Sequence, residues 1–176
     1  QRITEHGPLV NHNVISPHRT KGVGDMGADL ARDFGVTGPC LRAAGVARDV
    51  RKDEPYGIYD RFDFDIVTAE EGDCFARHMV RMGELEQSLN IIEQAVRDIP
   101  DGPVMAPKVP KRIRLPEGEH YFAVESGRGH FGMYLCRDGT DAPVRSTRRA
   151  ASLVDVPTMP PVLRGTMLAD RVAMRG

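Results

Sequence analysis

The longest periodic pattern in the chain runs from about Gly72 to Ile99. Apolar residues recur there at intervals of three and four positions, which is the spacing of one helix face. This apolar stripe consists of Phe75, Met79, Met82, Leu85, Leu89, Ile92, Val96 and Ile99. The polar residues on other faces include Arg77, Arg81, Glu84, Gln87, Gln94 and Asp98. A helix about 40 Å long needs partners along its stripe, so we expect it to belong to a helical bundle.

The ends of this helix and three shorter elements are also marked in the sequence. Asp73, or Thr68 with Glu71, can cap the start of the long helix, and the Pro-Asp-Gly-Pro sequence at 100–103 ends it. A helix is predicted over 27–34 with Gly35 as its C-cap, a short helical or turn element over 39–45, and a last helix over about 161–174.

Two strands are predicted by short apolar runs on either side of a glycine-rich turn. They cover 119–125 and 131–137, with the turn at 126–129, and 144–148 is a candidate third strand. Residues 100–118 hold five prolines and are interpreted as an extended connector. The predicted fold class is α+β: mainly helical, with a small antiparallel hairpin or sheet, in one domain over 1–176.

Composition narrows the function classes. The chain has 176 residues and a formal net charge of -1, which implies no strong attraction to nucleic acid. No apolar run approaches the length of about 18 residues that a membrane span needs. Cys40, Cys74 and Cys136 are odd in number and widely spaced, so a reduced, cytoplasmic setting is expected. A start at Gln1 without a signal peptide, and an abrupt end at Gly176, favour a segment of a longer polypeptide.

Two features near the start have weak chemical interpretations. His6, His12 and His18 are spaced by six residues, which suits surface histidines better than zinc ligands, since no cysteine accompanies them. Gly22-Val23-Gly24 lacks the Lys-Ser or Lys-Thr of a phosphate-binding P-loop and the preceding strand of a dinucleotide site. We predict a turn before a helix there.

The stretch from Gly38 to Asp65 is dense in glycines, alternating charges, tyrosines and phenylalanines. Pro55 pushes the residue before it toward an extended conformation, and no unbroken strand pattern follows. We predict an ordered loop anchored by the aromatic side chains. On sequence alone it is either a clamp built on Arg–Asp pairs or a charged lining of a functional chamber.

Several segments together resemble the D subunit of proton-pumping NADH:quinone oxidoreductase, respiratory complex I. The resemblance is carried by GPCLRAAGVARDVRKDEPYGIYDRFDFD at 38–65, by GDCFARHMVRMGELEQSLNIIEQAVRDIPDGPV at 72–104, by the hairpin at 119–148 and by PPVLRGTMLADRVAMRG at 160–176. Residues 1–37 match less well. The resemblance covers the C-terminal part of the subunit and implies the helical-bundle portion of the nickel–iron hydrogenase large-subunit fold. Arg171 and Arg175 depart from it, because the family has apolar residues there. Either acidic partners bind these arginines, or the last helix is less buried here.

The resemblance implies a peripheral-arm subunit that helps form the quinone-reduction chamber and couples electron transfer to proton translocation. Its partners would be the adjacent iron–sulfur cluster subunit and membrane-arm subunits, on the cytoplasmic side of the inner (plasma) membrane. The chain itself would bind no cofactor and no metal. NADH, FMN and iron–sulfur clusters would belong to partner subunits, and quinone would be the substrate.

No catalytic residue is carried over, because the family's quinone-binding His and Tyr fall in the N-terminal half of the subunit, outside this chain. The candidates near the chamber or its proton path are Asp49, Arg51, Lys52 and Asp60, each at a charged position of the motif. Two alternatives stay open. One is a large-subunit fragment of membrane-associated nickel–iron hydrogenase, and the other is a non-catalytic helical scaffold. On its own, the segment is expected to be poorly stable or to self-associate.

Overall fold

A computed structural model of the chain describes residues 7, 10–11, 13–109, 115–140 and 142–174. Its elements are, in order, α2 (Ile15–Thr20), α3 (Ala28–Asp33), α4 (Pro39–Ala43), α5 (Val50–Asp53), η1 (Tyr59–Arg61), α6 (Cys74–Arg97), β1 (Gly118–Ser126), β2 (Gly129–Arg137), β3 (Arg145–Arg149), α7 (Ala151–Asp155), η2 (Val156–Thr158), α8 (Met159–Val162), η3 (Leu168–Asp170) and α9 (Arg171–Met174). The α+β fold class is confirmed.

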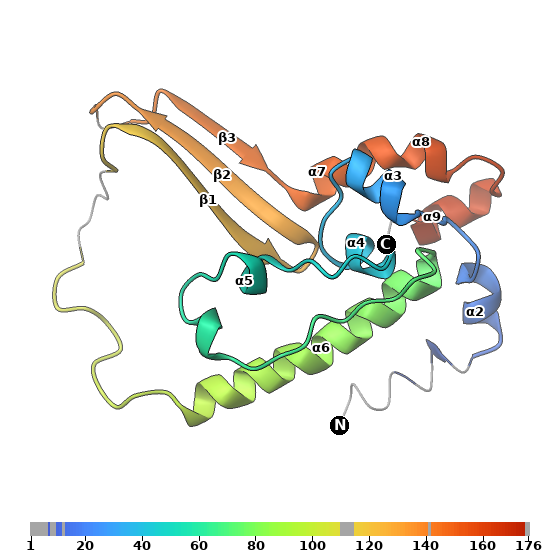
Figure 1. Ribbon diagram of the computed structural model, residues 1–176, viewed down its shortest axis with the longest axis horizontal. Helices are drawn as coiled ribbons and strands as arrows, with labels where there is room; N and C mark the ends of the chain where they lie inside the picture. Colours follow the sequence, from blue (N-terminus) through green and yellow to red (C-terminus); the bar gives the residue numbers. More distant parts are fainter. Residues whose placement is uncertain (1–6, 8–9, 12, 110–114, 141, 175–176) are drawn as a thin grey trace.

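The helix α6 and the sheet form the two long arms of the molecule (Figure 1). They converge near α4, and α3, α7, α8 and α9 gather beyond that junction. The sheet is antiparallel with strand order β1-β2-β3. Glu125 pairs with His130 in register, and Gly127 and Arg128 form the turn between β1 and β2. The three predicted strands are therefore confirmed.

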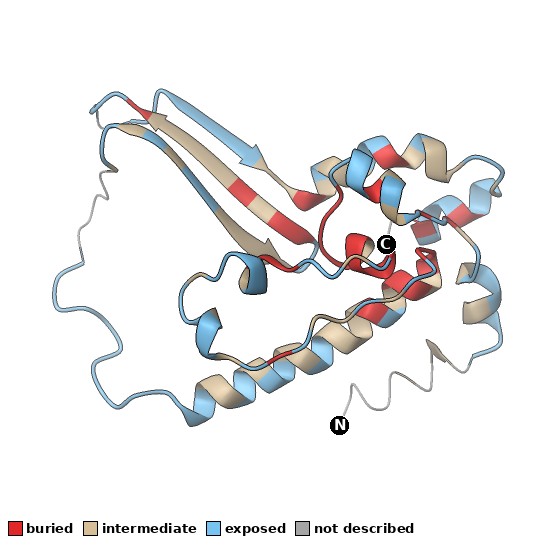
Figure 2. Cartoon of the chain, viewed as in Figure 1, coloured by how far each residue is buried: buried red, intermediate tan, exposed pale blue. Residues whose placement is uncertain are grey.

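Buried residues concentrate at the junction between α4, the first half of α6 and the inner end of the sheet (Figure 2). One cluster joins Ala43 of α4 to Ala76 and Val80 of α6. These are small side chains, which allow the backbones to approach closely. Gly83 continues this close contact, since a Cβ at that position would lie 2.8 Å from a methyl group of Val67. A neighbouring cluster joins α3 to α4 through Met26, Ala31, Val36, Leu41 and Ala44.

The start of α6 and the predicted turn at 22–24 form one hydrogen-bonded unit. The carboxylate of Asp73 accepts from the Ala76 N–H at 2.7 Å and from the Gly22 N–H at 2.7 Å. Gly22 and Gly24 have φ near +65°, which favours glycine. The buried Arg77 guanidinium donates to the Gly24 carbonyl at 3.0 Å. The turn and the Asp73 cap are both confirmed, and the glycine turn fixes the first turn of α6.

The face of α6 that packs against the rest of the chain is the opposite of the predicted one. Its buried side carries Ala76 and Val80, and Gln87 and Gln94 follow on the same side. Their side-chain oxygens accept from the backbone N–H groups of Asp65 and Asp63. Most of the apolar stripe instead lies exposed: Leu89 is 50% accessible, Ile92 56% and Val96 68%, whereas Phe75 and Met82 near the start of the helix are half-buried. The helix is confirmed, but burial of the stripe within this chain is not.

The prediction of a single helix over 161–174 is wrong. The structure has short pieces instead, because α8 ends at Val162 and Gly165 takes a left-handed φ of 79° that stops a helix. Arg171 lies exposed at the start of α9, so the structure favours the less-buried alternative over an acidic partner. Arg175 lies outside the described residues.

The remaining predicted elements agree with the structure where it describes them. α3 and α4 appear as expected, and the C-cap of α3 is Phe34, with the predicted cap residue Gly35 directly after it at a left-handed φ of 68°. Aromatic contacts anchor the loop after Pro55, and Phe64 is only 2% accessible. Residues 100–109 contain no helix or strand, and 110–114 fall outside the described part. Among the described helices, none is long and apolar enough to cross a membrane.

The exposed stripe predicts self-association of the isolated segment, since large contiguous apolar patches mark contact surfaces. Leu89→Gln with Ile92→Gln should reduce the apparent mass of the segment in sedimentation velocity and leave its circular dichroism unchanged. Val80→Gln on the buried side is the control and should unfold it. A sharply melting monomer before any substitution would contradict this expectation.

Candidate functional site

A fully buried arginine lies where α4, α6 and β1 meet. Arg42 lies on α4 and is 2% accessible, and its guanidinium binds groups from α6, from β1 and from the segment just before α5. Its Nε donates to the Glu84 carboxylate at 2.6 Å, and its Nη2 donates to Glu125 Oε1 at 3.0 Å. Its Nη1 donates to the Arg48 carbonyl at 2.7 Å and lies 3.7 Å from the Asp49 carboxylate. One cation thus joins three carboxylates from distant parts of the sequence.

Glycine-mediated contact places this arginine against the sheet. Gly38 precedes α4 with φ of 69°, and a Cβ on it would lie 2.3 Å from the Cα of Gly129. Only a residue without a side chain allows this approach, and Pro39 then starts the helix with a preset φ. The Thr37 hydroxyl accepts from the His130 N–H at 3.1 Å and fixes the same junction.

Asp49 has a second role as the cap of α5. Its carboxylate accepts from the Arg51 N–H at 2.9 Å and from the Arg51 guanidinium at 3.0 and 2.6 Å. The guanidinium of Arg51 also lies 4.9 Å from the ring centre of Phe64 and 5.9 Å from that of Tyr59. This cation–π packing holds Arg51 against the aromatic loop. We call Arg42, Asp49, Arg51, Glu84 and Glu125 the buried ion network.

The two most buried carboxyls of the network have opposite pKa shifts. Burial raises the pKa of Asp49, but the hydrogen bonds and charge of Arg51, with the charge of Arg42, outweigh it and hold the value below normal. Burial also raises the pKa of Glu125, and there the charge of Arg42 does not compensate, partly because Asp49 is close. The network therefore contains one strongly held carboxylate and one that binds a proton more readily.

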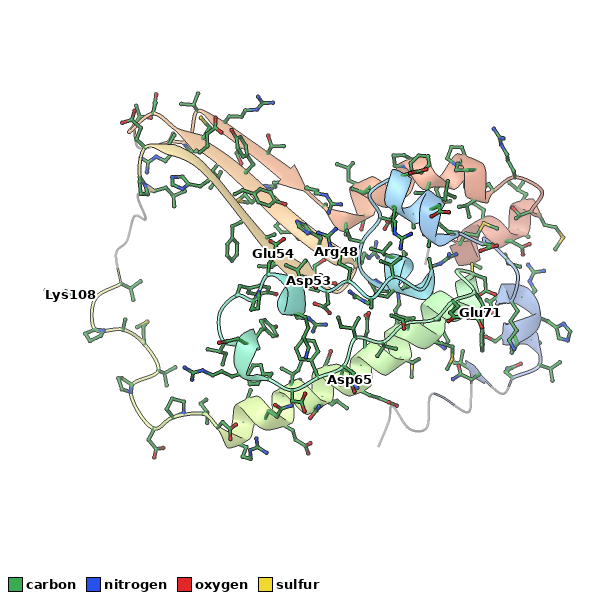
Figure 3. All side chains as sticks on the ribbon, viewed as in Figure 1. Arg48, Asp53, Glu54, Asp65, Glu71 and Lys108 are labelled. Carbon is green, nitrogen blue, oxygen red and sulfur yellow. The ribbon has the colours of Figure 1, made fainter. Side chains whose placement is uncertain are left out.

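Only two of the four predicted site residues lie in the network. Asp49 and Arg51 are bonded to each other. Lys52 is exposed, with its Nζ 4.5 Å from the ring centre of Phe64, and Asp60 is exposed on η1. Around α5, Arg48, Asp53 and Glu54 form an outer charged rim, while Lys108 lies far away on the connector (Figure 3). The Arg48 and Asp53 side chains are 4.0 Å apart.

Sequence reasoning missed Arg42, Glu84 and Glu125. Each lies in a segment of the family resemblance, but the sequence patterns gave none of the three a role at the site. The signal for Glu84 was its place opposite the apolar stripe, which is the side that packs. Arg42 follows a glycine–proline pair in a run of small residues, and that context indicates close packing around a long polar side chain.

Of the three evenly spaced histidines near the start of the chain, the structure describes His18. Within its described residues, no group of three or more His, Cys, Asp or Glu side chains could hold a metal ion. His18 is exposed on α2, and His6 and His12 lie outside the described residues.

Comparison with known proteins agrees with the resemblance found in the sequence. The family model described as respiratory-chain NADH dehydrogenase, 49 Kd subunit, matches residues 1–113 and 108–176. The two matched segments meet in the proline-rich connector. The chain belongs to this family of respiratory-chain NADH dehydrogenase subunits.

Individual relatives carry matching names. The D subunit of NADH-quinone oxidoreductase from Syntrophobacter fumaroxidans is 49% identical over 175 residues, covering 99% of this chain and 47% of the relative. The D subunit from Desulfotalea psychrophila is 45% identical over 168 residues, covering 96% and 45%. The C/D subunit from Bacteroides fragilis is 45% identical over 174 residues, covering 99% and 33%. The chain thus spans about half the length, or less, of these curated relatives.

Removal of the central cation should be strongly destabilising. Arg42→Met leaves the buried Glu125 carboxylate and the half-buried Glu84 carboxylate without their partner, and breaking a buried pair costs about 3–5 kcal/mol. Urea denaturation of the full-length subunit would measure the loss. Arg97→Met is the matched control, because it makes the same substitution at an arginine whose ion pair with Asp98 is exposed on the surface. Equal stability of the two variants would contradict a structural role for the network.

The pKa of Asp49 predicts a loss of stability in acid. A carboxyl whose pKa is lowered on folding contributes stability above its ordinary pKa of 3.8, and that contribution disappears as pH falls through its folded-state pKa. The stability difference between wild type and Asp49→Asn should therefore be largest near neutral pH and shrink below pH 3.8. Denaturant unfolding of the full-length subunit over this pH range would measure it. A pH-independent difference would exclude the carboxylate charge as the cause.

Proposed function

We propose that this chain is part of a peripheral-arm subunit of NADH:quinone oxidoreductase, where it helps form the quinone-reduction chamber. The family match along almost the whole chain is the observation that carries this proposal. The names of the relatives favour the quinone branch over a hydrogenase or an unrelated scaffold. The nickel–iron hydrogenase-like bundle remains part of the proposal.

In this role the buried ion network holds a rigid charged wall beside the chamber. Its ion pairs fix α5 and the loop that follows, and this loop presents Lys52 and Asp60 at the surface. A quinone takes up protons when it is reduced, so exposed charged groups in its chamber can orient it or deliver protons. Asp49 and Arg51 would act by positioning, because both are engaged with each other.

The surroundings of the subunit follow from the same proposal. The exposed α6 stripe would be covered by the rest of the subunit. Partner subunits would hold FMN and the iron–sulfur clusters and bind NADH, including the cluster-bearing subunit next to the chamber and the membrane arm. The site would face quinone on the cytoplasmic side of the membrane, and the complex would couple reduction to proton translocation.

The exposed charges give the sharpest test of the chamber. Lys52→Met and Asp60→Asn should each lower quinone reduction by the assembled complex about tenfold, which corresponds to one lost interaction of about 1.4 kcal/mol in the transition state. NADH oxidation with an artificial acceptor at the flavin should be unchanged. Lys108→Met, on the distant connector, is the control for Lys52→Met. Normal quinone reduction in both test variants would refute a chamber at this loop.

A further inference from the structure

The charges of the buried ion network do not balance. Two guanidinium groups, those of Arg42 and Arg51, contact three carboxylates, those of Asp49, Glu84 and Glu125. One negative charge is therefore in excess when all five groups are ionised. An uncompensated charge in a buried position is costly, and proton uptake by one carboxyl removes that cost.

The groups around Glu125 leave this excess in place. Within the described residues, the titratable and charged groups around it come from several packed elements. They are Arg42, Arg48, Asp49, Arg51, Tyr56 and His130, with Glu84 bound to the same Arg42 guanidinium. Burial lowers the pKa of His130, and the charges of Arg149 and Arg48 lower it further, so its imidazole is neutral near pH 7. The Arg48 side chain is 53% accessible and pairs with Asp53, so solvent screens its charge.

Among the three carboxylates, Glu125 has the weakest hold on its negative charge. Asp49 has bidentate contact with Arg51, and Glu84 has the short 2.6 Å bond to Arg42 and is 19% accessible. Glu125 is 6% accessible and shares Arg42 with both. Its Oε1 accepts from Arg42, whereas the one hydrogen bond to its Oε2 from the described part of the chain is a long 3.4 Å bond from the Val50 N–H. A proton can thus be added at Oε2 while the bond to Arg42 remains.

We propose that Glu125 is a proton-binding residue that takes up one proton at Oε2 and releases it again, so that the buried ion network alternates between net charges of zero and -1. The step forms one O–H bond on the carboxylate, with the proton drawn from solvent, and changes no oxidation state. The link between this proton and quinone chemistry rests on the proposed function. The titration of Glu125 does not depend on the proposed function.

A pH titration of stability in the full-length subunit tests the proposal. A carboxyl whose pKa is raised on folding contributes stability that is fully present below its ordinary pKa of 4.5 and is lost as pH rises through the folded-state pKa. Wild type should therefore lose stability relative to Glu125→Gln as pH rises above 4.5. Glu125→Asp keeps a carboxyl and should retain a pH-dependent difference from Glu125→Gln. Glu86→Gln, at an exposed site on α6, should follow wild type at every pH.

Two results would overturn the proposal. Parallel pH curves for wild type and Glu125→Gln would show that this carboxyl does not titrate in the folded range. The opposite trend, with wild type losing stability toward acid relative to Glu125→Gln, would show that it is an ordinary carboxylate partner of Arg42. If Glu125→Gln does not fold, carboxyl-13C labelling of glutamate in the wild-type subunit should reveal one resonance that titrates above the others, and its absence would equally refute the idea.

The assembled complex separates this inference from the proposed function. If both are correct, Glu125→Gln should shift the pH profile of quinone reduction and leave flavin-site NADH oxidation unchanged. A titrating Glu125 with an unshifted quinone profile and normal Lys52→Met and Asp60→Asn variants would refute the chamber proposal alone. A flat titration with defective Lys52→Met and Asp60→Asn variants would refute the proton-binding inference alone.

Discussion

The rest of this structure depends on the ion pairs and hydrogen bonds that the guanidinium of Arg42 makes. It reaches α6 through Glu84, the strand β1 through Glu125 and the start of α5 through Asp49 and the Arg48 carbonyl. Hydrophobic burial alone would not fix this junction, because its core consists largely of small side chains. Small residues give close contact but little directional preference. The N–H groups of a planar guanidinium, in contrast, point in fixed directions, so their acceptors must lie in a defined arrangement.

This arrangement explains why the aromatic loop after Pro55 is ordered without belonging to a helix bundle or a sheet. Arg51 is held by Asp49, which is close to Arg42, and the rings of Tyr59 and Phe64 pack on Arg51 in turn. Tyr56 accepts from the Glu125 N–H at 3.1 Å and ties the loop to the sheet. The charged groups of the loop are thereby linked to the buried ion network through a short series of direct contacts.

The sequence predicted the features that depend on a local pattern of residues. It did not predict the contacts between residues that are distant in the sequence. The period of α6, the Asp73 cap and the hairpin turn at Gly127 are local, and all were found. Arg42 and Glu125 are 83 positions apart, so no local pattern connects them. The packed face of α6 was not predicted, because its polar residues Glu84, Gln87 and Gln94 bind groups that are distant in the sequence. The last helix failed at Gly165, whose backbone conformation overrides a periodic pattern.

The two faces of α6 have different physical roles as a result. The polar face, with Glu84, Gln87 and Gln94, makes specific hydrogen bonds to Arg42 and to the backbone of 63–65. Such bonds favour one register of the loop against the helix, because a shift along the helix would break all of them. The apolar face carries no such selection and can accept any complementary surface. A helix that packs on its own chain through polar contacts thus leaves most of its hydrophobic stripe exposed.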